Sequence, residues 1–535
     1  MDSIKATNLL ASLTDGAKAG NVSRRQFMEG AAAAGLTVAA ASTLWATDVK
    51  AATPQKGGKY SVGLHDGNTT DSHDPGTYES VGQIQLAHTT RNWLTEQLPN
   101  GDVIGEIAES WDASSDAKTW SFKIRKGVEF HNGKTLTPAD VAASLNYHRG
   151  EDSKSAAKAQ LEAVSDVKVD GDNVVLTCST GFADLPYTLT DYHLVMLPEK
   201  DGSVDWASGT GTGGYKIESH DAGISTQMTR NPNYFKSDRA HFDEVEFTVL
   251  NDINARGTAL KTGEVDSVTS LDLKTVALMG RDPNIEIDNT ASGAHVTIPM
   301  FCDTAPFDNL HVRQALKYGF PREEAIQKIK KGFATIGNDS PIGPGIPYYH
   351  AQEQRPYDPD KSRWHLKQAG LDKVSVSLSA ADSAYAGAVD TAILFKEAAS
   401  KGGVEIDVLR EPNDGYWSNV WLVKPFVMVQ WGQRPTPDVM FSLAYGADAA
   451  WNESHWKNAR FNELLAAAKG ELDQAKRTEM YAEMQILCRD DGGTIVPWFT
   501  NRVSGRRNYI QHDELISGIW ELDGGRSAER WWRTS

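Results

Sequence analysis

Five tryptophans fall within 40 residues in the C-terminal third of the chain, separated by polar residues that could contact a small molecule. An indole offers a flat apolar surface and one hydrogen-bond donor, which suits the wall of a cleft around a small solute. Trp417 and Trp421 are as consistent with a hydrophobic core as with a cleft. We expect the other three, Trp431, Trp451 and Trp456, to line a binding cleft.

Polar residues beside these tryptophans are the candidate ligand contacts. A run that is typical of a buried strand, 426–429, leads into Trp431, and the glycine that follows would let the backbone approach a ligand closely. The arginine of this loop favours a carboxylate or another anion, although a solvated loop charge is an equally good interpretation. The candidate contacts are Gly432, Gln433, Arg434, Asn452 and His455.

Catalytic, nucleotide and metal motifs give no convincing constellation. Residues 209–214 satisfy G-x-G-x-x-G, but 215–217 is typical of a strand rather than of the helix that a dinucleotide site needs. Two histidines and three aspartates within 65–74 suit a turn better than a metal site. Among the three cysteines, Cys488 lies on an apolar helical stripe and is expected in the core, and one disulfide remains open. We therefore expect no catalytic residue, no cofactor and no metal.

Composition excludes several classes of partner. The 535 residues carry a net charge of −17, which argues against nucleic acid and anionic membranes, since both require clustered Lys and Arg. No apolar run approaches the roughly 18 residues of a membrane-spanning helix. Length alone predicts about three domains in a soluble protein.

The first 51 residues are expected to be a signal peptide rather than part of the fold. Ser23 to Met28 reads SRRQFM and resembles the twin-arginine export motif, and an alanine-rich apolar segment, 30–45, follows it. Val49-Lys50-Ala51 suits a cleavage site. Export to a periplasm without a lipid anchor is expected, because no cysteine lies near this site.

The segment 100–145 shows the elements that organise the rest of the chain. An Asn-Gly turn precedes the alternating strand 120–124, and Gly127 ends that strand. Thr137-Pro138 with Asp140 then predicts a helix that begins with a capping box. Further along, strands are predicted at 374–378 and 404–409 with a helix between them, which is an α/β arrangement.

This segment resembles the hallmark of the family 5 extracellular solute-binding proteins, the peptide, opine and nickel binders of ABC importers. GDVIGEIAESWD, TWSFKIRKGVEFHNG and LTPADV match the family's blocks in order and spacing. Further similar blocks lie at 231–235, 262–266, 306–316 and 357–360, so that the resemblance covers nearly the whole chain after residue 51. It implies an α/β, two-lobed periplasmic-binding-protein-like fold with an inserted subdomain, the three-domain cluster C type. Lobe I would comprise 53–97, 206–300 and 495–535, with 98–205 as the subdomain and 301–494 as lobe II.

The resemblance also implies how a solute would be held. In peptide-binding members an aspartate after the strand at 426–429 binds the ammonium group of the peptide, and gapless alignment puts Gln433 at that position. An amide cannot neutralise an ammonium group, which weakens the case for ordinary peptides, although Asp438 would compensate if the loop shifts.

We therefore expect a monomeric periplasmic protein that captures a peptide or peptide-like solute between hinged lobes and delivers it to ABC permease transmembrane subunits. The alternatives are a receptor for a specialised non-peptide solute such as an opine, a chelate or another anionic compound, a twin-arginine-exported periplasmic enzyme, and a sensor or chaperone that uses the same cleft.

Overall fold

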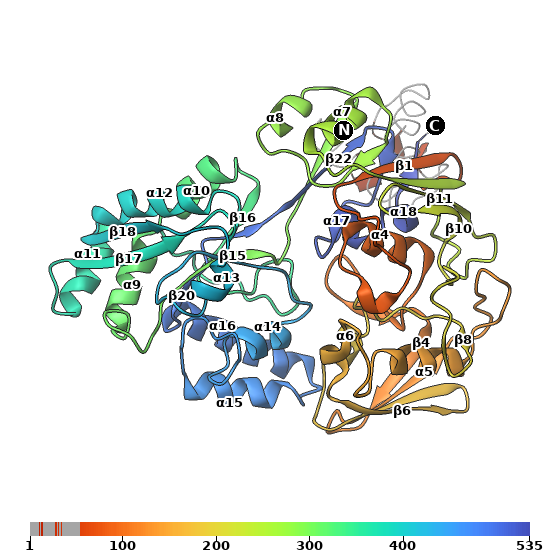
Figure 1. The fold of residues 1–535 in the computed structure, drawn as a ribbon, viewed down its shortest axis with the longest axis horizontal. Coiled ribbons are helices and arrows are strands. Elements are labelled where there is room, and N and C mark those ends of the chain that lie inside the picture. Colours follow the sequence, from red (N-terminus) through yellow and green to blue (C-terminus); the bar gives the residue numbers. More distant parts are fainter. Residues whose placement is uncertain are drawn as a thin grey trace.

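The computed structural model describes residues 54–534 and a few isolated positions among the first 53. The arginine pair Arg24-Arg25 and the cleavage site predicted near Ala51 lie outside the described residues. Two lobes lie side by side, with the C-terminus in the lobe that also contains the first strand (Figure 1). None of the helices in the described part is long and apolar enough to cross a bilayer.

Lobe I is built on a seven-stranded mixed sheet in the order β10-β11-β12-β1-β13-β22-β14. The strands are β1 (Lys59–Leu64), β10 (Tyr215–Asp221), β11 (Ser225–Arg230), β12 (Glu244–Val249), β13 (Ser267–Val268), β14 (Ile285–Thr290) and β22 (Arg502–Arg507). The longer helices of the lobe are α4 (Val81–Thr90) and α7 (Ile253–Thr262). The strand β10 directly follows the glycine-rich turn at 209–214, which confirms that this turn does not open a nucleotide-binding helix.

The subdomain is a four-stranded antiparallel sheet covered by the helix α5 (Pro138–Tyr147). Its strands are β4 (Ala108–Ala113), β5 (Thr119–Ile124), β6 (Val164–Asp170) and β7 (Asn173–Cys178). Along β5, Trp120, Phe122 and Ile124 are buried while the residues between them are more exposed, as the alternation predicts. The capping box of α5 also forms, because the Asp140 carboxylate accepts from the Thr137 backbone N–H at 2.8 Å.

Lobe II contains the antiparallel strands β15 (His295–Pro299), β16 (Ala334–Ile336), β19 (Val429–Trp431), β20 (Thr494–Ile495) and β21 (Trp498–Thr500). A parallel pair, β17 (Val374–Ala380) and β18 (Val404–Arg410), adjoins them through the bridge Ser379–Val427. The helices are α9 (Leu310–Gly319), α10 (Arg322–Ile329), α11 (Pro359–Gln368), α12 (Ala388–Ser400), α13 (Tyr416–Asn419), α14 (Pro437–Ala444), α15 (Ala459–Ala468) and α16 (Gln474–Asp490). The predicted strand, helix and strand at 374–409 are thus β17, α12 and β18.

The chain crosses between the lobes twice, at 291–294 and at Asn501. The two crossings run side by side, because the Thr500 N–H donates to the Ala294 carbonyl at 2.7 Å and the Ser292 hydroxyl donates to the Thr500 carbonyl at 2.7 Å. The strands β15 and β21 hydrogen-bond within the sheet of lobe II, whereas the sequence-based division assigned 206–300 and 495–535 to lobe I. We propose the same three-part division with lobe II enlarged to about 295–500.

Candidate functional site

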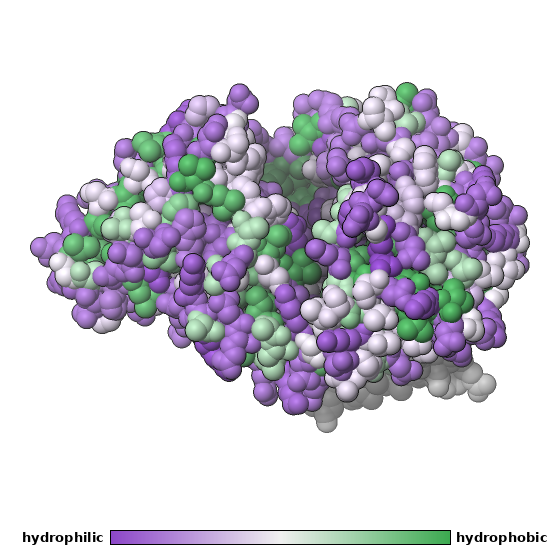
Figure 2. All heavy atoms as spheres, turned by 60° about the horizontal axis from the view of Figure 1, so that its bottom comes forward, coloured by the Kyte–Doolittle hydropathy of each residue, from purple (hydrophilic) through white to green (hydrophobic). Residues whose placement is uncertain are grey.

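The strand β19 ends at Trp431, directly opposite His295 at the start of β15 and next to the crossing between lobes. Its indole is 4% exposed, and its N–H donates to the Glu453 carboxylate at 3.1 Å. Trp431 is thus held in a fixed orientation next to the crossing between the lobes. Figure 2 shows a hollow between the two lobes.

Trp431 belongs to a cluster of four tryptophans on lobe II. The ring centroid of Trp421 lies 5.7 Å from that of Trp417, 6.1 Å from that of Trp431 and 5.6 Å from that of Trp451. The centroids of Trp431 and Trp451 are 5.8 Å apart. Trp417 is 45% exposed and Trp451 is 39% exposed, so part of the cluster faces solvent. From the sequence, Trp417 and Trp421 were as consistent with a hydrophobic core as with a cleft, whereas the structure places them in one cluster with Trp431 and Trp451.

Glu453 is a functional candidate that the sequence analysis passed over. It is 3% exposed and accepts hydrogen bonds from the Thr297 hydroxyl at 2.7 Å, the Trp421 indole at 2.9 Å and the Trp431 indole at 3.1 Å. Burial raises the pKa of the Glu453 carboxyl, and these hydrogen bonds oppose the rise. The sequence feature that could have indicated it is its position, because Glu453 is the one acidic residue between Trp451 and Trp456.

Gln433 and Arg434, in the loop after β19, make different contacts. The Gln433 amide oxygen accepts from the Gly293 N–H at 2.8 Å and so ties the loop to the crossing segment. The Arg434 guanidinium lies 5.7 Å from the Trp431 ring centroid, and its hydrogen bonds go only to neighbouring carbonyls at 3.3 and 3.4 Å. Among the described residues no carboxylate forms an ion pair with Arg434, although burial lowers the pKa of its guanidinium. Arg434 is thus a cation whose charge no carboxylate in the described part of the chain compensates.

Aromatic residues of the subdomain and of lobe I lie near Arg434. Tyr192 is close enough for the Arg434 guanidinium to lower its pKa, although burial raises that pKa more. Tyr192 packs edge-on against Trp520 at 4.9 Å, and Arg502 lies 5.7 Å from the Trp520 ring. Sequence analysis missed this wall because Tyr192, Arg502 and Trp520 come from segments far apart in the chain.

The lobes touch along one edge, where Asp438 lies. In that contact Arg477 of α16 forms a buried ion pair with Asp184 of the subdomain, and the Ala183 N–H donates to the Lys469 carbonyl at 2.8 Å. Asp438, in the first turn of α14, has a carboxylate oxygen that is buried without a hydrogen-bond partner. Burial, and after it the nearby Asp184 charge, raises the pKa of Asp438 to about 7. Asp438 therefore belongs to the contact between lobes and does not replace an aspartate at position 433.

Three of the other expected contacts have partners within lobe II. The Trp456 side chain is 2% exposed and donates to Asp491 at 2.9 Å, and the Asn452 amide donates to the carbonyls of Gly446 and Trp456 at 3.2 and 2.8 Å. His455 lies over Phe301 with ring centroids 3.8 Å apart and hydrogen-bonds Asp303. These contacts use polar groups of the three residues within the lobe, and their part in solute binding stays a prediction. Gly432 is exposed, and a side chain there would meet only Arg434, at 3.5 Å.

A cavity of about 380 Å³ lies beside the hinge and is lined by 97–101, 287–291 and 512–519 of lobe I and by Pro344 and Gly345 of lobe II. None of the predicted site residues lines it. Asp288, a charged residue in the wall of this cavity, already contacts Arg506 and His512. We place the candidate site instead at the facing walls of Arg434 and Tyr192, because charge there is left uncompensated.

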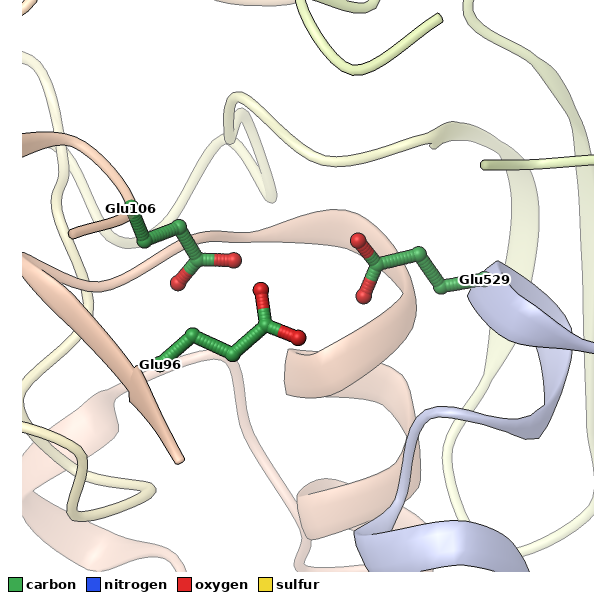
Figure 3. Close-up of side chains that lie close together, drawn as sticks. All are labelled: Glu96, Glu106 and Glu529. Carbon is green, nitrogen blue, oxygen red and sulfur yellow. The ribbon is translucent and has the colours of Figure 1, made fainter. Parts of the chain in front are cut away.

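The groups that most resemble a metal site are Glu96, Glu106 and Glu529, whose carboxylates point toward one another in lobe I (Figure 3). The Lys236 ammonium lies 2.6, 2.5 and 3.0 Å from these three carboxylates, and Arg526 and Arg530 pair with them as well. The lysine thus occupies the place where a cation would bind.

The turn at 65–74 uses an aspartate for a side-chain-to-backbone hydrogen bond, as predicted, since Asp74 accepts from the Gly76 N–H at 2.8 Å. All three cysteines are free, and Cys488 is 1% exposed in the core.

Comparison with known proteins agrees with this architecture. The model of the bacterial extracellular solute-binding proteins, family 5 Middle, matches residues 102–453. A di/tripeptide-binding protein of Pseudomonas aeruginosa is 24% identical over 468 residues, covering 78% of this chain and 84% of the relative. The structure of HbpA2 from Haemophilus parasuis superposes with a TM-score of 0.78 at 18% identity, covering 89% of this chain and all of the other. A PBP from A. tumefaciens R10 in complex with agropinic acid superposes with a TM-score of 0.67 at 22% identity, covering 89% and 99%.

The family model extends over more than half of the chain, and both solved structures share its two-lobed α/β fold. The relatives are solute-binding proteins rather than enzymes. This chain belongs to the bacterial extracellular solute-binding proteins of family 5.

Proposed function

We propose that this protein captures a peptide or peptide-like solute between its two lobes and delivers it to the transmembrane subunits of an ABC permease. The observation that carries the proposal is Arg434, a half-buried cation that forms no ion pair with a carboxylate among the described residues and lies near Tyr192 of the subdomain. A solute with a carboxylate, such as the C-terminus of a peptide, would supply the missing charge through a charge-assisted hydrogen bond.

Two crossings that run side by side in opposite directions give the lobes a hinge about which they would close. A solute favours the closed form only to the extent that it binds that form better than the open one. Arg434 on lobe II and the Tyr192–Trp520 pair on lobe I would contact the same solute only when the lobes are close. The permease would then recognise the closed form.

A specialised non-peptide anion, such as an opine, is the second candidate. It is favoured by Gln433, whose amide is engaged with the Gly293 N–H and cannot neutralise a peptide ammonium group. The similarity in fold to a protein solved with agropinic acid agrees with this candidate. In either case we propose a monomer that reaches the periplasm by twin-arginine export and loses its signal peptide near Ala51.

The experiment is native mass spectrometry of the protein purified from a periplasm, followed by release and identification of the bound compound. A set of short peptides would support the peptide proposal, and a single non-peptide anion would support the second candidate. Arg434→Gln should weaken binding of the released compound at least tenfold, about 1.4 kcal/mol. Arg410→Gln, at an exposed arginine on β18, serves as the matched control and should leave affinity unchanged. A released compound without an anionic group would refute the role of Arg434.

A further inference from the structure

Glu453 is a buried carboxylate that lacks a cationic partner in the part of the chain that the structure describes. Its three hydrogen-bond donors, Thr297, Trp421 and Trp431, are all neutral. Within residues 54–534 no lysine, arginine or histidine forms an ion pair with it. A buried carboxylate is costly unless it is paired, and the other fully buried glutamates follow that rule, since Glu96, Glu106 and Glu529 each contact Lys236. Glu453 is therefore an exception among the buried glutamates of this part of the chain, and a cation from outside the chain would compensate its charge.

The tryptophans around Glu453 are arranged to attract a cation. Trp421 and Trp431 donate their indole N–H groups to its carboxylate, so a negative charge sits at the edge of both rings and adds to the negative potential of their faces. Tryptophan is the best aromatic partner for a cation. The guanidinium of Arg434, at 5.7 Å from the Trp431 ring, is already placed as such a partner.

Trp451 completes a corner with these two rings. It is tilted by 67° from Trp421 and by 54° from Trp431, and those two are tilted by 73° from each other. A cation in this corner would lie within about 6 Å of each ring centroid, the range of cation–π attraction. Trp451 is 39% exposed, so part of the ring that completes the corner faces solvent.

We propose that Trp421, Trp431 and Trp451 hold a cationic nitrogen of the solute, an ammonium or quaternary ammonium group, with Glu453 as its buried counter-charge. The inference rests on the proposed solute-binding function and specifies its ligand as a zwitterion. Arg434, 5.7 Å from the Trp431 ring centroid, binds the anionic group, and the neighbouring tryptophan corner binds the cationic group. Glu453 thereby supplies the negative charge that position 433 lacks, and Asp438 does not, because it faces Asp184 in the contact between lobes.

The test is calorimetric titration of the protein with two pairs of probes that differ only in the cation. Choline is compared with 3,3-dimethyl-1-butanol, its neutral carbon analogue, and dialanine with N-acetyl-dialanine. In at least one pair the cationic member should bind at least tenfold more tightly. A preference within the choline pair alone identifies a quaternary ammonium solute, and one within the dialanine pair alone identifies a primary ammonium. Equal affinity or no binding in both pairs would overturn the inference.

Two variants and a control test whether the preference for the cationic probe depends on the tryptophan corner and Glu453. Glu453→Gln should abolish the preference for the cationic probe, and Trp451→Leu, at an exposed ring, should reduce it at least fivefold without lowering the melting temperature. Trp364→Leu replaces a tryptophan that is 49% exposed on α11 and should change nothing. A preference that survives Trp451→Leu would also overturn the inference. If the compound released from the periplasmic protein binds tightly but carries no cationic nitrogen, the inference fails while the solute-binding function stands.

Discussion

The contact between the lobes should weaken as pH rises, because Asp438 lies in this contact and loses its proton. Its pKa of about 7 lies above the usual 3.8 because its carboxyl is buried and Asp184 is near, whereas Lys469 and Arg477 offset only part of this. A carboxyl with a raised pKa favours the folded state most when it is protonated. Stability should therefore fall between about pH 4 and pH 7 and level off above pH 7.

The size of the effect follows from the shift. One pKa unit corresponds to about 1.4 kcal/mol, so the full shift of about three units sets an upper limit of about 4 kcal/mol. Residue Asp438 as a whole is only half-buried, so we expect about 1 to 3 kcal/mol. Asp438→Asn should remove that part of the pH dependence, because an amide does not ionise.

The assay is urea unfolding followed by circular dichroism at pH 5, 6, 7 and 8. The difference in unfolding free energy between Asp438→Asn and the wild type should grow in favour of the variant up to pH 7. Asp448→Asn, at an exposed aspartate on the loop after α14, is the matched control and should track the wild type at every pH. Parallel curves for Asp438→Asn and the wild type would refute the reasoning, since they would mean that Asp438 ionises at its ordinary pKa.

Two further predictions concern the buried glutamates and the hinge. Lys236→Met leaves three buried carboxylates short of one shared cation, and we expect a loss of about 3 to 5 kcal/mol in urea unfolding. A chelator should not change the melting temperature of the wild type, because the ammonium holds the place of a metal, and a shift would contradict this. Gly293→Ala would bring a methyl group to 2.8 Å from Ile346 and 2.9 Å from Gln433, so we expect a loss of about 1 to 3 kcal/mol. An unchanged melting temperature in Gly293→Ala would show that the hinge can relax.

Local chemistry is what the sequence predicted best. The helix α11 begins as expected, with Asp358 accepting from the Lys361 N–H at 2.8 Å and Gly370 in the left-handed region beyond its end. Such features depend on residues within a few positions of one another, which a sequence shows directly. The family resemblance supplied the two lobes, which local patterns cannot give.

The site was predicted only in part, because its partners are distant in the chain. Tyr192 and Arg434 are 242 positions apart, and nothing local in 190–194 indicates a cleft. Trp456 is flanked by polar loop residues, as expected of a cleft tryptophan, yet its indole donates to Asp491 at the end of α16. A tryptophan within a polar loop is thus ambiguous until the partner of its N–H is known.

The contrast between the two groups of buried acids suggests how the molecule divides into moving parts. Glu106 comes from the edge of the subdomain, Lys236 from lobe I, and Arg526 and Glu529 from the C-terminal segment, and all of them join in one network. A network with its charges compensated holds its elements together, so lobe I and the subdomain should move as one body. The crossings at 291–294 and Asn501 then carry the hinge motion, and the contact of Arg477 with Asp184 is made or broken by it. Arg434 and Glu453, which have no ion pair among the described residues, both lie on lobe II. A solute that compensates their charges would meet the subdomain at Tyr192 when the lobes close.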